Sequence, residues 1–75
     1  MVLITKMTDK LFIELNTFLK LKNLASTGGQ AKVLIRSGEI LVNGEVEMRN
    51  RRKLLVGDEV KYKGKMYVVE KEVVR

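Results

Sequence analysis

The chain has 75 residues, enough for one domain with a small hydrophobic core and no deep substrate pocket. It contains no histidine and no cysteine, which excludes the usual zinc ligands, a thiolate nucleophile and disulfides, so we expect no metal, no cofactor and no enzymatic activity. The formal net charge of +6 favours a nucleic acid as the partner, ahead of an anionic membrane or an acidic protein.

The N-terminal part of the chain is predicted to form a strand and then a helix. An apolar segment at Val2–Lys6, followed by turn-forming residues, predicts the strand. Apolar side chains at helical spacing predict a short amphipathic helix from about Glu14 to Leu21. Lys20 and Lys22 lie at its C-terminal end, where cations stabilise the exposed carbonyl groups.

A second helix has a clear start and a clear end in the sequence. Thr27 and Gln30 form a capping-box pair that predicts its first turn. Gly38 is the expected left-handed residue after its last turn. Its buried face is predicted to consist of apolar side chains at helical spacing, which are Ala31, Leu34 and Ile35. Its outer face is predicted to carry Gly29, Lys32, Val33 and Arg36.

Strands are predicted from residue 39 onward, because the apolar period changes from helical spacing to two. Ile40–Val42 is followed by Asn43–Gly44, a strong signal for a two-residue hairpin turn, and residues 45–47 form the returning strand. A second hairpin is predicted around residues 63–65. Glu45 and Glu47 are interpreted as solvated strand residues. The pattern therefore predicts an α+β fold with two short helices packed on a small, bent and mainly antiparallel sheet.

Positive charge gathers in two places along the chain. No acidic residue occurs between Glu14 and Glu39, and that window contains Lys20, Lys22, Lys32 and Arg36. The second group follows the first hairpin and consists of Arg49, Arg51, Arg52 and Lys53. We expect this second group to lack a local acidic partner, so that a polyanion relieves its repulsion. Alanine at Arg51 and Arg52 is then expected to weaken binding of that polyanion with little change in stability.

The spaced set of motifs resembles the S4 RNA-binding domain, also called the αL motif, over about Phe18 to Val60, with a core at about residues 14–62. The matching elements are Phe18-Leu19-Lys20, Thr27, Ala31 with Leu34-Ile35, Ser37-Gly38, Glu39-Ile40-Leu41-Val42-Asn43-Gly44 and Gly57-Asp58-Glu59-Val60. More narrowly, Thr27-Gly28-Gly29-Gln30-Ala31-Lys32 and the segments after it look like stand-alone bacterial S4-like proteins of the YaaA and YbcJ type. Many S4 domains place arginine directly after the helix cap, where this chain has Gly28.

The resemblance implies binding of structured RNA, most plausibly ribosomal RNA or tRNA on a ribosomal particle, by a cytoplasmic monomer that needs no cofactor or membrane. The residues expected to contact RNA are Lys20, Lys22, Thr27, Gly28, Gly29, Gln30, Lys32, Val33, Arg36, Asn43, Gly44, Arg49, Arg51, Arg52 and Lys53. The glycine pair could instead be a plain helix entry, and Asn43-Gly44 could serve only the turn. A basic protein-interaction module and a DNA-binding regulator remain as alternatives.

Overall fold

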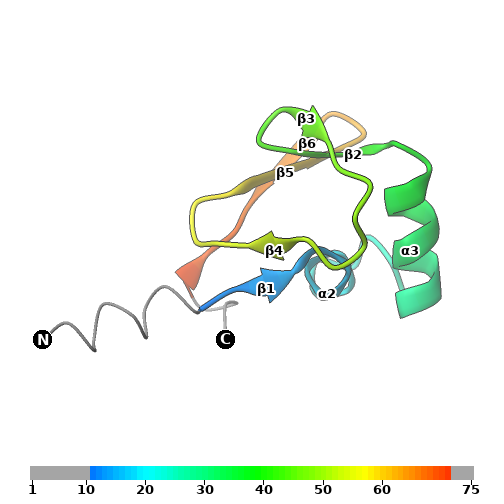
Figure 1. The fold of residues 1–75 in the computed structure, drawn as a ribbon, viewed down its shortest axis with the longest axis horizontal. Helices are drawn as coiled ribbons and strands as arrows, with labels where there is room; N and C mark the ends of the chain where they lie inside the picture. The colour runs from blue at the N-terminus through cyan, green and yellow to red at the C-terminus, as the bar shows by residue number, and fades with distance from the viewer. Residues whose placement is uncertain (1–10, 72–75) are drawn as a thin grey trace, which may run out of the picture.

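The computed structural model describes residues 11–71, so the strand expected at Val2–Lys6 lies outside the described residues. Two helices and two antiparallel sheets make up the described part (Figure 1). The helices are α2 (Leu15–Leu21) and α3 (Gly28–Arg36). The strands are β1 (Ile13–Glu14), β2 (Ile40–Val42), β3 (Glu45–Val46), β4 (Lys53–Leu54), β5 (Glu59–Tyr62) and β6 (Lys65–Val68). The α+β fold predicted from the sequence is confirmed.

Helix α2 begins one residue after the predicted start, and its first amides donate hydrogen bonds to carbonyl groups of a distant loop. Its N-cap, Glu14, makes no side-chain cap. Instead, the amide of Leu15 donates to the carbonyl of Arg52 at 2.8 Å, and the amide of Asn16 donates to the carbonyl of Asn50 at 3.1 Å. Because the first amides of a helix have no partners within it, these two bonds fix the loop to the start of α2.

Helix α3 has the cap that the sequence indicates. The amide of Gln30 donates to Oγ1 of Thr27 at 3.1 Å. The Gln30 side chain reaches back one residue further than in the standard capping box, since its Oε1 accepts from both the amide and the hydroxyl of Ser26, at 2.6 and 2.7 Å. Gly38 follows the helix with a φ of +84°, the left-handed conformation expected there.

The strands form two sheets rather than the one bent sheet that was expected. The larger sheet has the order β3-β2-β5-β6, and the smaller one pairs β1 with β4. Asn43 and Gly44 form the β2–β3 turn with φ values of 53° and 87°, as a two-residue hairpin with positive φ at both positions requires. Lys63 and Gly64, at 51° and 80°, form the β5–β6 turn in the same way.

The hydrophobic core lies between the two sheets and the two helices (Figure 1). Ile13 and Leu54 come from the smaller sheet, and Val42 pairs with Val60 in the larger one. Both helices add fully buried side chains, which are Leu15, Phe18, Leu19, Ala31 and Ile35. Within residues 11–71, no helix has the length and apolar character needed to cross a bilayer.

Candidate nucleic-acid interface

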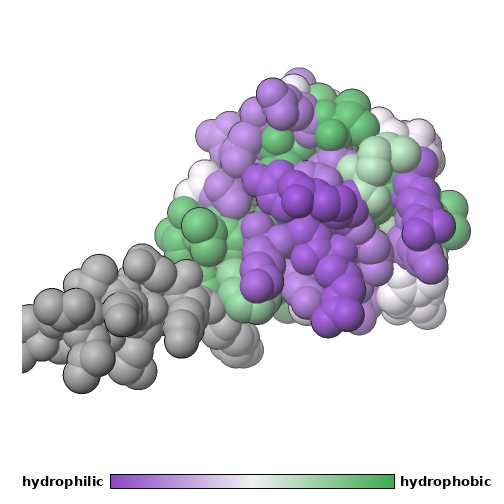
Figure 2. Space-filling view, in the orientation of Figure 1, coloured by the Kyte–Doolittle hydropathy of each residue, from purple (hydrophilic) through white to green (hydrophobic). Residues whose placement is uncertain are grey.

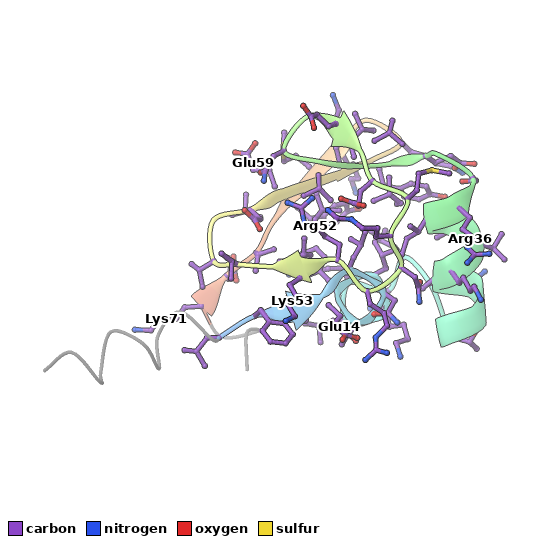
Figure 3. All side chains as sticks on the ribbon, viewed as in Figure 1. Glu14, Arg36, Arg52, Lys53, Glu59 and Lys71 are labelled. Atoms are coloured by element: carbon purple, nitrogen blue, oxygen red, sulfur yellow. The ribbon has the colours of Figure 1, made fainter. Side chains whose placement is uncertain are left out.

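The first cationic group lies on the two helices and consists of Lys20, Lys32 and Arg36. Together with the uncharged residues beside these cations, Val33 and the helix start Gly28–Gly29, we call it the helix group. Lys32, Val33 and Arg36 are exposed on α3, as its periodicity predicts, and Arg36 projects from its outer side in Figure 3. Among the described residues, no carboxylate lies within 4.0 Å of the Lys32 or Arg36 charge. These two cations are therefore available to an anion.

The helix group also brings Lys20 of α2 to the start of α3. A methyl group added to Gly28 would lie 3.9 Å from Nζ of Lys20, and one added to Gly29 would lie 3.9 Å from Oγ1 of Thr27. Neither glycine has a positive φ. Alanine would thus fit at both positions, so the fold itself does not require glycine there. The start of α3 therefore lies beside the Lys20 ammonium group.

Two other lysines are held against aromatic rings at the edge of the core. Nζ of Lys22 lies 5.7 Å from the centre of the Phe18 ring. Nζ of Lys53 lies 4.9 Å from the centre of the Phe12 ring. At these distances the ammonium groups are attracted to the ring faces, which restricts both side chains; Lys53 is exposed and Lys22 is half-buried.

The second cationic group lies between β3 and β4 and includes the first residue of β4, and we call it the arginine loop: Arg49, Asn50, Arg51, Arg52 and Lys53. Its four cations line an open pocket of about 580 Å³. The amide of Arg52 donates to the carbonyl of Arg49 at 3.3 Å, which closes a turn inside the loop. Together with the two bonds to α2, this turn gives the loop a defined backbone. Arg52 and Lys53 are labelled in Figure 3.

A buried carboxylate, Glu47, pairs with two cations of the arginine loop. Its residue is only 7% exposed. Oε2 accepts from both the amide and Nε of Arg49 at 2.9 Å, and Oε1 accepts from Nη2 of Arg49 at 3.1 Å and from Nη1 of Arg52 at 2.6 Å. The expectation that the loop lacks an acidic partner is wrong, and so is the interpretation of Glu47 as a solvated strand residue.

A second carboxylate reaches the arginine loop from β1. Nε of Arg51 donates to Oε2 of Glu14 at 3.2 Å, although 37 positions separate the two residues. The side chains of Arg49 and Arg51 remain 71% and 77% exposed, whereas that of Arg52 is 29% exposed. Arg49 and Arg51 therefore present their charge to solvent, and Arg52 mainly holds the loop together.

Asn43 and Gly44 lie away from both cationic groups, at the end of β2 opposite α3 (Figure 1). Asn43 bridges the hairpin to β5: its Oδ1 accepts from the amide of Glu59 at 2.9 Å, and its Nδ2 donates to Oδ1 of Asp58 at 3.2 Å. The other oxygen of Asp58 accepts from the amide of Leu55 at 2.8 Å. Both ends of the Asn43 amide are thus engaged in fastening the turn.

Comparison with known proteins assigns the fold. The sequence model of the S4 domain matches residues 6–70. The chain belongs to the S4 domain family. It is 45% identical over 56 residues to a Bacillus subtilis strain 168 protein named "Probable ribosome maturation protein RlbA", covering 75% of this chain and 79% of that protein. It is 40% identical over 52 residues to the Escherichia coli strain K12 "Putative RNA-binding protein YbcJ", and the match covers 69% of this chain and 74% of that protein.

The sequence analysis did not predict that Glu14 and Glu47 pair with the arginine loop of this S4 domain. The hairpin nevertheless indicates the position of Glu47. The two-residue turn sets the register in which Val42 faces Glu45, and the amide of Glu47 donates to the carbonyl of Ile40 at 3.0 Å. Glu47 therefore shares a sheet face with Ile40 and Val42, whose side chains are buried. That register places Glu47 on the inner face, beside the cations that follow it.

Acid should destabilise this S4 domain through Glu47. Hydrogen bonds from the Arg49 side chain, followed by those from its backbone and from Arg52, lower the pKa of Glu47 from 4.5 to about 2. A depressed pKa in the folded state adds stability above pH 4.5 that is lost as the pH falls towards 2. We expect this to be about 1–2 kcal/mol, since the main partner Arg49 faces solvent. Urea unfolding at about pH 7 and about pH 3 should show the stability difference between wild type and Glu47→Gln shrinking in acid; a constant difference would contradict the assignment.

Proposed function

We propose that this protein binds structured RNA, most plausibly ribosomal RNA or tRNA on a ribosomal particle. The binding is passive docking and involves no chemical step. The helix group and the arginine loop contact phosphates on either side of an RNA groove, and the shape of the RNA determines which site is bound. We further propose that the protein acts as a single-domain monomer in the cytoplasm and needs no cofactor.

The observation that carries this proposal is that two parts of the chain far apart in sequence each present more cations than carboxylates on the surface. Figure 2 shows hydrophilic surface over the arginine loop in the middle of the molecule and over α3 at its right edge. Lys32 and Arg36 have no carboxylate partner among the described residues, and the loop cations outnumber Glu14 and Glu47. An RNA backbone is the extended polyanion that would neutralise both areas at once.

The names of the relatives support the same partner class. One is named as a ribosome maturation protein and the other as an RNA-binding protein. The start of α3 supports it in another way. Gly28 stands where many S4 domains have an arginine, so we propose that the backbone amides at the helix start and the Lys20 side chain together receive a phosphate there.

A salt titration tests the proposal. The helix group has three cations, and the arginine loop has four cations paired with two carboxylates, so about five positive charges remain for phosphates. The logarithm of the association constant should therefore fall with a slope of about −4 to −5 against the logarithm of the salt concentration. The probe is a folded ribosomal RNA fragment, measured by fluorescence anisotropy. A slope near zero would contradict the proposal, and equal competition by duplex DNA would favour a DNA-binding regulator. Crosslinking in cells, followed by sequencing of the attached RNA, would identify the target.

A further inference from the structure

We propose that Glu47 is a positioning residue for RNA: it fixes the guanidinium groups of Arg49 and Arg52 so that their unused donors face a phosphate. This inference rests on the proposed function. It assigns a role to a carboxylate on a surface that otherwise attracts anions. Such a carboxylate lowers the positive charge of the interface, so charge attraction alone gives no reason for it to be there.

The geometry of Arg49 leaves one side of its guanidinium group free. Nε and Nη2 both point at the Glu47 carboxylate, at 2.9 and 3.1 Å, while the side chain is 71% exposed. All of Nη1 and the second hydrogen of Nη2 therefore remain without a partner in the described residues. These donors lie on the edge that forms a fork with a phosphate, so Arg49 can hold Glu47 and RNA at the same time.

Arg52 makes fewer hydrogen bonds to Glu47 than Arg49 does, and its side chain is less exposed. Only its Nη1 donates to Glu47, at 2.6 Å, so Nε and Nη2 have no partner among residues 11–71. The same carboxylate thus joins two guanidinium groups that flank one pocket of about 580 Å³. Fixing the two side chains before binding reduces the rotamer entropy that would otherwise be lost when RNA is bound.

Removal or shortening of the Glu47 carboxylate separates positioning from charge. Glu47→Gln raises the net charge by one, so charge attraction alone predicts tighter RNA binding. Glu47→Asp keeps the net charge, so charge attraction alone predicts no change in RNA affinity. Positioning predicts that both variants bind the ribosomal RNA fragment about tenfold more weakly, because neither holds Arg49 in the fork geometry. Anisotropy titrations are made below the melting temperature of each variant, with far-UV circular dichroism as the check on folding. In NMR spectra, the Arg49 Nε–H signal should exchange faster with water in both variants.

Arg49→Lys tests the positioning role while leaving Glu47 in place. It remains informative if the Glu47 variants fail to fold. The charge is unchanged, but an ammonium group cannot hold a carboxylate and form a phosphate fork together, so we expect a loss of about tenfold. Arg36→Lys is the matched control on α3, where no carboxylate fixes the side chain, and we expect a loss of less than about threefold. The double variant Glu47→Asp/Arg49→Lys should lose no more than either single variant.

The outcomes distinguish this inference from the proposed function. If wild type binds the RNA and Glu47→Gln binds as tightly or more tightly, positioning is overturned and RNA binding stands. The same conclusion follows if Arg49→Lys and Arg36→Lys lose affinity equally. If wild type itself shows no salt-dependent RNA binding, the proposed function fails and the inference fails with it.

Discussion

Reversing the two exposed cations of α3, by Lys32→Glu together with Arg36→Glu, should weaken binding of structured RNA by about 100-fold or more. Hydrogen bonds that involve charged groups contribute roughly 1.5–3 kcal/mol each, so loss of two phosphate contacts alone reaches this magnitude. The two new carboxylates add repulsion. Folding should change little, because both side chains are exposed and have no carboxylate partner in the described residues. Glutamate near the C-terminal end of α3 costs a few tenths of a kcal/mol.

The matched control reverses the same number of charges at a different place. Lys63 and Lys65 are exposed on the β5–β6 hairpin, outside the helix group and the arginine loop. Lys63→Glu with Lys65→Glu gives the same net charge as the α3 variant and should lose less than about tenfold, through long-range attraction alone. Anisotropy titrations at one salt concentration compare the two. Equal losses would show that only net charge matters and that α3 is not a contact surface.

The parts of this fold that were predictable are those governed by local chemistry. Thr27 with Gln30 indicates the start of α3, Gly38 its end, and Asn43–Gly44 a hairpin whose register follows from its two-residue turn. The division into two sheets was not predictable in this way. Strands β1 and β4 have two residues each and pair Ile13 with Leu54, far apart in the sequence. No periodicity can develop over two residues, and only tertiary packing selects the pair.

The candidate site divides in a similar manner. Helical periodicity alone places Lys32 and Arg36 on one exposed face, and the structure agrees. Charge counting along the chain fails for the arginine loop, because ion pairing depends on distance in space. Glu14 meets Arg51 through the β1–β4 pair, and Glu47 meets Arg49 and Arg52 because it lies directly after β3, opposite the buried Ile40. The loop therefore carries less free charge, and more order, than its sequence indicates.

The two neighbouring arginines of the loop should differ sharply in their effect on stability. Arg52→Ala removes the 2.6 Å bond to the buried carboxylate of Glu47. Breaking a buried ion pair costs roughly 3–5 kcal/mol, but Glu47 keeps Arg49, so we expect a loss of about 2 kcal/mol in the free energy of unfolding. Arg51→Ala breaks only an exposed pair with Glu14 and should cost less than about 0.5 kcal/mol. The sequence analysis expected little change in stability for both arginines; because the Arg52 side chain is only 29% exposed and pairs with Glu47, we now predict a larger loss for Arg52.

Two measurements on the same pair of variants separate structure from binding. Urea unfolding gives the stabilities, and RNA titration at a temperature where both variants are folded gives the affinities. Arg51→Ala should bind RNA about tenfold more weakly with near-native stability, because its 77% exposed side chain is free to meet a phosphate. In Arg52→Ala, the buried carboxylate of Glu47 loses one of its two arginine partners. A third variant, Arg52→Ala combined with Glu47→Leu, removes that carboxylate and should recover part of the lost stability. If Arg52→Ala were as stable as Arg51→Ala, the Glu47–Arg52 pair would not hold the loop, and the arginine loop would be ordered by its backbone bonds to α2 alone.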